Sequence, residues 1–396
     1  MELKTLANAA KEIKFKDKRV LLRVDYNVSI KNGKVADDTR IRESLKTIEF
    51  LIKKGAKIIL ISHLGRPKGV DETLRLDPVA EHLSKLLKKP VIKVDSCTGD
   101  SVLAAVNAMH GSDILMLENT RFNKEEEAND TNFSKALAAY ADVYVSDAFG
   151  TVHRAHASTE GVAHFLPSYA GFLIEKEITN LEPLLKKPAK PFVLLIGGAK
   201  IDTKIGILKN FIHKADTILI GGGLANTFLA AKGFDIGNSL CEKDKIEVAQ
   251  EIIMEADKAK CELVLPEDVI VADEISDNVI TADAEITGVE GTMQILDLGK
   301  RSTNKYIEIL KKAKTIIWNG PVGLFEKKPF ENGTKEIALA LSKVKGKTYL
   351  GGGDTIDALN KFQINEKAFT HISTGGGAML EYLEGRELPG IKVLMA

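Results

Sequence analysis

The chain has 396 residues, of which 44% are hydrophobic and 28% charged, as in a folded globular protein rather than a disordered one. Its formal net charge is zero, which argues against a nucleic-acid or membrane-surface partner. No apolar run approaches the about 18 residues that cross a bilayer, and the N-terminus lacks a signal-peptide pattern. Three cysteines (Cys97, Cys241 and Cys261) follow no metal-binding spacing. We therefore expect a cytoplasmic protein with two domains of about 180–200 residues each.

Strand-like runs alternate with helical patterns, which predicts α/β lobes with parallel sheets between layers of helices. In the first half, the expected strands are Val20–Asp25, Lys57–Ser62, Asp113–Glu118 and Val143–Asp147. The expected helices are Ile41–Lys54, Pro78–Leu87 and Phe133–Tyr140. Gly55 follows the first of these helices, where a C-terminal cap is expected.

Polar residues follow each predicted strand of the first half. Ligands of open parallel sheets bind beyond the carboxyl ends of the strands, so these residues are candidates for a site. Four arginines at or near these ends can converge on a small, multiply anionic molecule: Arg40, Arg66, Arg121 and Arg154. The planar guanidinium group suits carboxylate and phosphate. Each arginine taken alone is more often a surface ion pair, and their shared placement favours the binding role.

Three histidines of the same half, His63, His153 and His156, have no cysteine or carboxylate at ligand-like spacing. This argues against a zinc site. Anion binding or structural hydrogen bonding is the favoured interpretation, and a phosphohistidine intermediate remains an alternative.

The segment 171–187 separates two halves of different composition. Apolar residues at Ile174, Ile178, Leu181 and Leu185 form one helical stripe. Pro188 blocks continuation of the helix, and an internal proline, five positions earlier, is expected to kink its last turn. Most arginines and histidines precede this helix and most glycines follow it. The split favours a connector between two ligand-binding lobes over an ordinary surface helix.

In the second half, the expected strands are Phe192–Ile196, Thr217–Ile220, Glu262–Leu265, Thr315–Trp318 and Thr348–Leu350. Four stretches run from a strand into glycines, namely Gly197-Gly198, Gly221–Gly223, Gly351–Gly353 and Gly375–Gly377. Glycine lets the backbone approach a ligand, and a helix starting there offers free N–H groups to an anion. One such turn would be weak evidence for a ligand site, but four of them predict that this half binds a nucleotide or another polyphosphate. Neither a Walker loop nor a Gly-x-Gly-x-x-Gly with a later acid occurs.

Charged residues accompany these turns. If a helix starts near Gly198, Lys200 and Lys204 lie one turn apart on it. Two positive charges at a helix N-terminus would be stabilised by a bound anion. The alternative is that both lysines simply face the solvent. Asp354 is placed to hold Mg²⁺ beside a phosphate, or else to cap a helix. Glu326 follows a Pro/Gly turn, from which it can reach a ribose hydroxyl, whereas Trp318 fits a core position.

Together these motifs make the chain similar to the phosphoglycerate kinase family over essentially its full length. The motifs that carry the resemblance are Arg23–Asn27, Ser62–Pro67, His153–Ser158, Gly197–Lys204, Trp318–Glu326, Gly351–Thr355 and Ser373–Gly377. The resemblance implies two Rossmann-like lobes, 1–170 and 188–377, a hinge helix over 171–187, and a tail, 378–396, that packs back on the first lobe. It also implies a monomeric kinase of glycolysis and gluconeogenesis. The reaction would be 1,3-bisphosphoglycerate plus ADP giving 3-phosphoglycerate plus ATP with Mg²⁺, by direct in-line transfer and domain closure.

The resemblance assigns roles by motif. The residues implied to bind phosphoglycerate are Asp25, Asn27, Arg40, His63, Leu64, Gly65, Arg66, Arg121 and Arg154. Those implied to bind the nucleotide are Lys204, Gly221, Gly222, Asn319, Glu326, Gly352, Gly353, Asp354 and Thr355, with Asp354 also towards the metal. The implied catalytic residues are Arg40, Lys200, Gly375 and Gly376. Ser29 and Glu267 depart from the usual pattern at positions that carry no chemistry.

The residues and the family agree on the kind of chemistry. An acyl phosphate is a reactive donor, so the protein must align two anions and neutralise charge rather than supply a nucleophile. Two other classes remain open, a nicotinamide-dependent dehydrogenase and a non-catalytic scaffold of the same fold. Binding of a nicotinamide cofactor but not ADP would select the first, whereas intact Lys200, Arg40 and Asp354 argue against the second.

Overall fold

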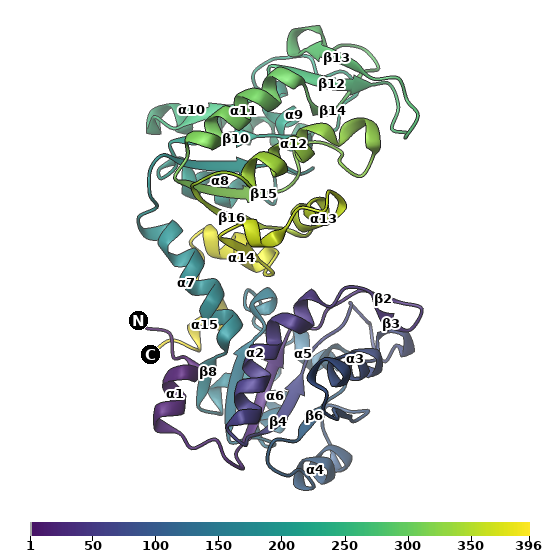
Figure 1. Ribbon diagram of the computed structural model, residues 1–396, viewed down its shortest axis with the longest axis vertical. Helices are drawn as coiled ribbons and strands as arrows, with labels where there is room; N and C mark the ends of the chain where they lie inside the picture. The colour runs from purple at the N-terminus through teal and green to yellow at the C-terminus, as the bar shows by residue number, and fades with distance from the viewer. Residues whose placement is uncertain (1) are drawn as a thin grey trace. The chain divides into compact units, whose positions relative to one another are not determined.

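The computed structural model describes residues 2–396, which divide into two compact units (Figure 1). One unit comprises the chain up to Leu181 together with Glu387–Ala396, and the other comprises Glu182–Arg386. Each contains a six-stranded parallel sheet with helices on both faces, as the alternating pattern predicts. Within residues 2–396, no helix is both long and apolar enough to span a membrane.

The first unit is built on a parallel sheet with strand order β5-β6-β4-β1-β7-β8. The strands are β1 (Arg19–Val24), β4 (Lys57–Ile61), β5 (Ile92–Lys93), β6 (Ile114–Met116), β7 (Val143–Asp147) and β8 (Ser168–Ala170). The helices are α1 (Leu6–Glu12), α2 (Thr39–Lys53), α3 (Asp77–Leu87), α4 (Asp100–Asn107), α5 (Lys124–Glu127), α6 (Thr131–Ala138) and α15 (Pro389–Lys392). The central strands β1, β4 and β7 are almost wholly buried, because helices cover both faces. All four expected strands of this half are present, whereas the short edge strands β5 and β8 carry too few apolar residues to be predicted.

Helix α2 ends as its sequence predicts. Gly55 adopts a φ of 74°, and its N–H donates to the carbonyl of Ile52 at 2.9 Å. The N–H of Ala56 donates to the carbonyl of Leu51 at 3.1 Å. These two bonds form a Schellman motif, which turns the chain directly into β4. A small hairpin of β2 (Ile30–Lys31) and β3 (Lys34–Val35) precedes α2.

The second unit contains a parallel sheet with strand order β11-β10-β9-β15-β16-β17. Its strands are β9 (Phe192–Ile196), β10 (Thr217–Ile220), β11 (Glu262–Val264), β15 (Thr315–Asn319), β16 (Lys347–Gly351) and β17 (His371–Ser373). Its helices are α8 (Ile205–Ile212), α9 (Gly222–Ala231), α10 (Ile246–Ala259), α11 (Lys300–Lys312), α12 (Asn332–Leu341), α13 (Gly353–Lys361) and α14 (Gly377–Leu383). The buried indole of Trp318 lies in the core at the centre of this sheet, as expected from its position.

The second unit also has an antiparallel sheet that the sequence analysis does not predict. Strand β12 (Asp268–Ala272) lies between β13 (Ala282–Glu285) and β14 (Gln294–Leu298). It packs one face against α9 in a small separate core that includes Leu229 and Val269. Strand β13 is largely exposed and polar, which explains why its sequence gives no strand signal.

Helix α7 (Phe172–Lys186) passes from one unit to the other and continues through Pro183. The chain returns to the first unit at Glu387, later than the expected position 378, because α14 packs against α8 inside the second unit. The last residues lie against the N-terminal segment, where the N–H of Ala396 donates to the carbonyl of Glu2 at 2.8 Å. The N–H of Gly390 donates to the carbonyl of Val152 at 2.9 Å.

Candidate functional site

The carboxyl end of β1 carries an ion pair whose carboxylate is buried. Arg40, in the first turn of α2, lies with its Nη1 2.5 Å from Oδ2 of Asp25. Burial alone would raise the pKa of Asp25, but the positive charges of Arg40 and Arg23 hold that pKa below its usual value. Gly150 leaves room for this carboxylate, because a Cβ there would lie 2.4 Å from Oδ2 of Asp25. The first turn of α2 thus holds a cation against an anion.

Neighbouring strand ends are joined through backbone and side-chain hydrogen bonds. The N–H of Gly65 donates to Oδ1 of Asn27 at 2.9 Å, and the carbonyl of Gly65 accepts from Nη1 of Arg121 at 2.7 Å. The buried Asn119 accepts from the N–H groups of Leu64 and Arg121, both at 3.1 Å. Three segments far apart in the sequence therefore meet at one edge of the first sheet. Asn119 and Gly150 were not predicted as site residues, since Asn119 acts by holding the backbone of Leu64 and Arg121 and Gly150 by leaving room for Asp25.

Two contiguous hollows lie beside these groups. Arg66, Arg154 and His156 line one of them, and Arg121 lines the other. Lys68 lines both. Burial, and then the charge of Arg121, lower the pKa of His156 to about 4, so its ring is neutral near pH 7. Among residues 2–396, Arg66 makes no hydrogen bond or ion pair, which leaves its guanidinium group free for an anion. The sequence analysis did not select Lys68 for this surface.

In the second unit, the glycine turns after β9, β10 and β15 are bound to one another. The N–H of Gly198 donates to the carbonyl of Pro321 at 2.8 Å, and that of Gly222 to the carbonyl of Val322, also at 2.8 Å. The N–H of Gly197 donates to the carbonyl of Asn319 at 2.9 Å. A Cβ on Gly221 would lie 2.7 Å from side-chain atoms of Val322. Glycine is required here for close backbone approach.

Lys204 and Asp354 form the charged part of this site. Lys204 is 9% exposed and donates to Oδ1 of Asn319, whose amide donates to the carbonyl of Gly351 at 2.7 Å. Burial lowers the pKa of Lys204 to about 8, against the attraction of Asp354. Thr355 accepts from the N–H of Gly320 at 2.8 Å, which ties α13 to the turn after β15.

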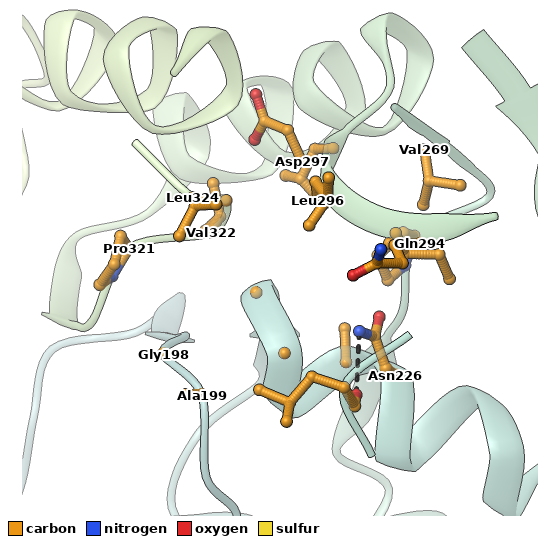
Figure 2. Close-up of a pocket in the computed structure, with 18 of the residues that line it drawn as sticks. Gly198, Ala199, Asn226, Val269, Gln294, Leu296, Asp297, Pro321, Val322 and Leu324 are labelled. Carbon is orange, nitrogen blue, oxygen red and sulfur yellow. Dashed lines mark hydrogen bonds between the residues drawn. The ribbon is translucent and has the colours of Figure 1, made fainter. Parts of the chain in front are cut away.

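A cavity of about 210 Å³ adjoins these turns. Figure 2 shows its walls, with Gly198 and Ala199 on one side and Leu296 and Gln294 on another. Gly222, Glu326 and Asp354 of the expected nucleotide set line it, whereas most of the wall is apolar and includes residues of α9 and β14. An apolar cavity beside polar turns suits an aromatic base that carries a charged tail. The β14 wall was missed because the antiparallel sheet was not predicted.

Two arrangements that the sequence left open do not occur. Helix α8 begins only at Ile205, so Lys200 precedes the helix and does not lie one turn from Lys204 on it. Lys200 is exposed and makes no ion pair within residues 2–396. The N-cap of α13 is Gly352, with a φ of 99°, so Asp354 lies inside the first turn and is not the cap. Gly376, with a φ of 53°, is the N-cap of α14 and follows Gly375.

The expected metal site rests on one residue, Asp354. Within residues 2–396, no group of three or more His, Cys, Asp or Glu side chains is placed to hold a metal ion. Asp354 adjoins the glycine turns and lines the cavity together with Glu326 and Asp297. That arrangement fits Mg²⁺, which binds through one or two carboxylates and the phosphates of its substrate.

These features define an α/β protein with a candidate site for anionic ligands beyond the carboxyl ends of each of its two parallel sheets. The sequence model of phosphoglycerate kinase matches residues 10–386. The chain is 51% identical to the phosphoglycerate kinase of Dictyoglomus turgidum over 96% of each chain, and 49% identical to that of Pelotomaculum thermopropionicum over 97% of this chain and 98% of the other. The structure of phosphoglycerate kinase from Coxiella burnetii, at 40% identity, superposes with a TM-score of 0.89 over 99% of each chain. That from Pyrococcus horikoshii, at 35% identity and 97% coverage of each chain, gives 0.85. The chain belongs to the phosphoglycerate kinase family, and it is a transferase with kinase chemistry.

Proposed function

We propose that the protein transfers a phosphoryl group between 1,3-bisphosphoglycerate and ADP, giving 3-phosphoglycerate and ATP in glycolysis and gluconeogenesis. The observation that carries most weight is the family match from residue 10 to residue 386, which includes every strand end described above. In the forward reaction, the bond between phosphorus and the carboxyl oxygen breaks. A bond forms between phosphorus and a terminal oxygen of ADP, and 3-phosphoglycerate leaves as a carboxylate.

The first unit is proposed to bind the acid. Its cations include Arg40, Arg66, Arg121 and Arg154, which suit a molecule that carries both a phosphate and a carboxyl group. Asp25, Asn27 and His63, with the backbone of Leu64 and Gly65, are proposed to bind its polar groups. The free guanidinium group of Arg66 and the hollow that it shares with Arg154 support this assignment.

The second unit is proposed to bind the nucleotide. The apolar cavity beside Gly222 suits the base, and Glu326 at its edge suits the ribose. Lys204, Gly221, Asn319, Gly352, Gly353 and Thr355 are proposed for the phosphates. Asp354 would hold Mg²⁺, which supplies positive charge to the phosphate oxygens when bound. The proposed ligands are thus the nucleotide, the metal ion and the acid. We further propose that the protein is a monomer and lies in the cytoplasm.

Catalysis is proposed to depend on alignment and charge. An acyl phosphate needs no enzyme nucleophile, and the charge on the group in transfer is spread over its oxygens. Arg40, Lys200 and the N–H groups of the turn at Gly375 and Gly376 are proposed to stabilise this charge. We also propose that the two units close around both ligands, because the donor and the acceptor must meet in line and without water.

A coupled assay with 3-phosphoglycerate and Mg-ATP tests the activity. We expect ADP formation that requires 3-phosphoglycerate, and no labelled protein after incubation with γ-labelled ATP alone. Absence of ADP formation with correctly folded protein would refute the proposed function. Labelled protein would instead refute direct transfer and support a phosphoenzyme. Binding of a nicotinamide cofactor but not ADP would indicate a dehydrogenase.

A further inference from the structure

A buried arginine holds His63 from behind. Arg23, at 1% exposure, comes from β1 and is not among the expected site residues. Its Nη2 lies 3.1 Å from Nδ1 of His63, and its Nη1 donates to the carbonyl of Val24. Its Nε donates to Oγ of Ser158 at 2.9 Å. All three nitrogens of this side chain are therefore engaged inside the protein.

The arginine contact determines which nitrogen of His63 carries a proton. A guanidinium group has N–H donors and no acceptor, so Nδ1 of His63 must accept the hydrogen bond. Nδ1 therefore has no proton, which excludes both the imidazolium ion and the tautomer protonated at Nδ1. Asp25 would favour a proton on Nδ1, but its Oδ1 is 4.0 Å away, beyond hydrogen-bond distance. Burial and the charge of Arg23 also lower the pKa of His63 well below its usual value, against the attraction of Asp25.

A chain of buried groups holds Arg23 in this position. Oγ of Ser158 accepts from Arg23, so its own proton is free to go to Oε1 of Glu126, 2.6 Å away. The other oxygen of Glu126 accepts from the N–H of Ser158 at 3.0 Å. Glu126 is fully buried, and its charge offsets that of Arg23 through the hydroxyl. Each hydrogen bond in this network can run in only one direction, so the network has one arrangement.

The free nitrogen of His63 is the one available to a ligand. Within residues 2–396, Nε2 of His63 has no hydrogen-bond partner, although the ring is only 4% exposed. The ring lies among Arg23, Asp25, Arg121 and Arg40, at the strand ends proposed to bind the acid. A proton on Nε2 makes this atom a neutral donor for a carboxylate or phosphate oxygen.

We propose that Arg23, held by Ser158 and Glu126, is a positioning residue that fixes His63 as the neutral Nε2–H tautomer and so makes it a hydrogen-bond donor to the acid substrate. The role towards substrate rests on the proposed function, whereas the tautomer does not. His63 then adds directional specificity among the surrounding guanidinium groups, which supply the charge. Because each nitrogen of Arg23 has a partner inside the protein, its effect on the ligand should pass through His63.

The tautomer can be measured directly on the whole protein without ligand. We expect the ¹⁵N spectrum of histidine-labelled protein to show His63 with an unprotonated Nδ1 and a protonated Nε2, unchanged between pH 8 and pH 6. A His63→Asn variant assigns the signals by their loss. A proton on Nδ1, or titration of His63 within that range, would overturn the proposal even if the kinase assay succeeds. The expected spectrum with a failed kinase assay would leave the tautomer standing and refute only the role towards this acid.

A serine substitution tests the positioning chain. Ser158→Ala removes the acceptor of Arg23 Nε and the donor to Glu126, so His63 should show a mixture of tautomers. We expect the KM for 3-phosphoglycerate to rise about three- to tenfold, the value of one hydrogen bond, with the KM for ATP and kcat within about twofold. The control Ser134→Ala removes another buried hydroxyl, which lies outside the Arg23–Ser158–Glu126 network. This hydroxyl donates to the carbonyl of Asp130 at 2.8 Å. Equal KM values in the two variants, or an unchanged His63 spectrum in Ser158→Ala, would overturn the proposal. The spectrum of the unsubstituted protein decides the matter if Ser158→Ala does not fold.

Discussion

The N–H of Gly198 donates to the carbonyl of Pro321 at 2.8 Å, and this bond joins the first glycine turn to the turn that carries Glu326. A Cβ on the adjacent Gly197 would lie 2.1 Å from the same carbonyl oxygen. Two motifs that are far apart in the sequence are thus in backbone contact beside the apolar cavity. Their glycines are required by this contact as well as by any ligand.

Replacement of Gly197 should therefore damage the nucleotide site through the backbone. We expect Gly197→Ala to lower the free energy of unfolding by about 2 kcal/mol or more, because the Pro321 carbonyl must move. ADP binding should weaken in parallel. Gly288→Ala is the matched control, since a Cβ there meets no atom within 4 Å. Thermal unfolding and calorimetric ADP titration measure both effects, and equal stability of the two variants would contradict the prediction.

Nucleotide affinity should depend on pH through Lys204. Its pKa is lowered to about 8 by burial, so the lysine loses its proton as pH rises through 8. A bound phosphate favours the charged form, and ADP binding above pH 8 should therefore take up a proton and weaken, by up to about tenfold per pH unit. Calorimetry at pH 8.5 in buffers of different ionisation enthalpy measures the uptake. Lys204→Arg should bind with no such dependence, and an identical proton uptake in that variant would show that another group is responsible.

The buried carboxyl group of Asp147 should reduce stability as pH rises. Its Oδ1 accepts from the N–H of Leu173 at 2.8 Å in the first turn of α7, while Oδ2 has no hydrogen-bond partner among residues 2–396. Burial raises the pKa of Asp147 to about 7, above the unfolded value of 3.8. The contribution of the protonated Asp147 to the free energy of unfolding is therefore complete below about pH 4, and it is lost as pH rises through 7.

Substitution of this residue isolates that effect. Asp147→Asn keeps an oxygen that can accept from Leu173 and has no charge to bury. We expect the variant to be more stable than the unsubstituted protein at pH 8, by on the order of 1–3 kcal/mol, and the difference to shrink towards pH 4. Denaturant unfolding across this range measures it. A constant difference at all pH values would rule out titration of Asp147 as the cause.

Arg40 and Lys200 should affect the rate more than binding. If both stabilise charge on the group in transfer, Arg40→Ala and Lys200→Ala should each lower kcat by about 10²–10³ while substrate affinity changes little. Lys312→Ala, at an exposed position of α11, is the control for loss of a surface charge. Near-normal kcat with a raised KM in either variant would mean that the residue only binds substrate.

The proposed closure predicts a change of size in solution. If each ligand contacts only one unit, as proposed, either alone should close the molecule partly at most, and the two together should close it further. Small-angle scattering of the free, singly liganded and doubly liganded forms gives the radius of gyration. The same radius in all forms would leave α7 as a connector with no hinge role.

How far the sequence determines the fold differs between elements. The central strands β1, β7, β9 and β15 are continuous apolar runs, because helices cover both faces of a parallel sheet, and their positions follow from the sequence. Gly55 likewise ends α2 as predicted, since a left-handed cap is a local requirement. Strands β12–β14 depend on contacts with α9 and with one another, and the exposed β13 has no local signal. The start of α8 at Ile205 does not follow from the sequence, because two glycines and two lysines fit a helix start or a loop equally well.

The candidate site shows the same division. The sequence by itself determined that arginines follow the strands of one half and glycines those of the other, because the carboxyl ends of parallel strands collect at one edge. Only the tertiary structure decided that Asn119 holds both Leu64 and Arg121, that β14 forms a wall of the cavity, and that Arg23 sets the proton on His63. Those relations join residues distant in the sequence through hydrogen bonds and burial. Periodicity and motif spacing carry no information on such contacts, which exist only once the sheet has brought its strand ends together.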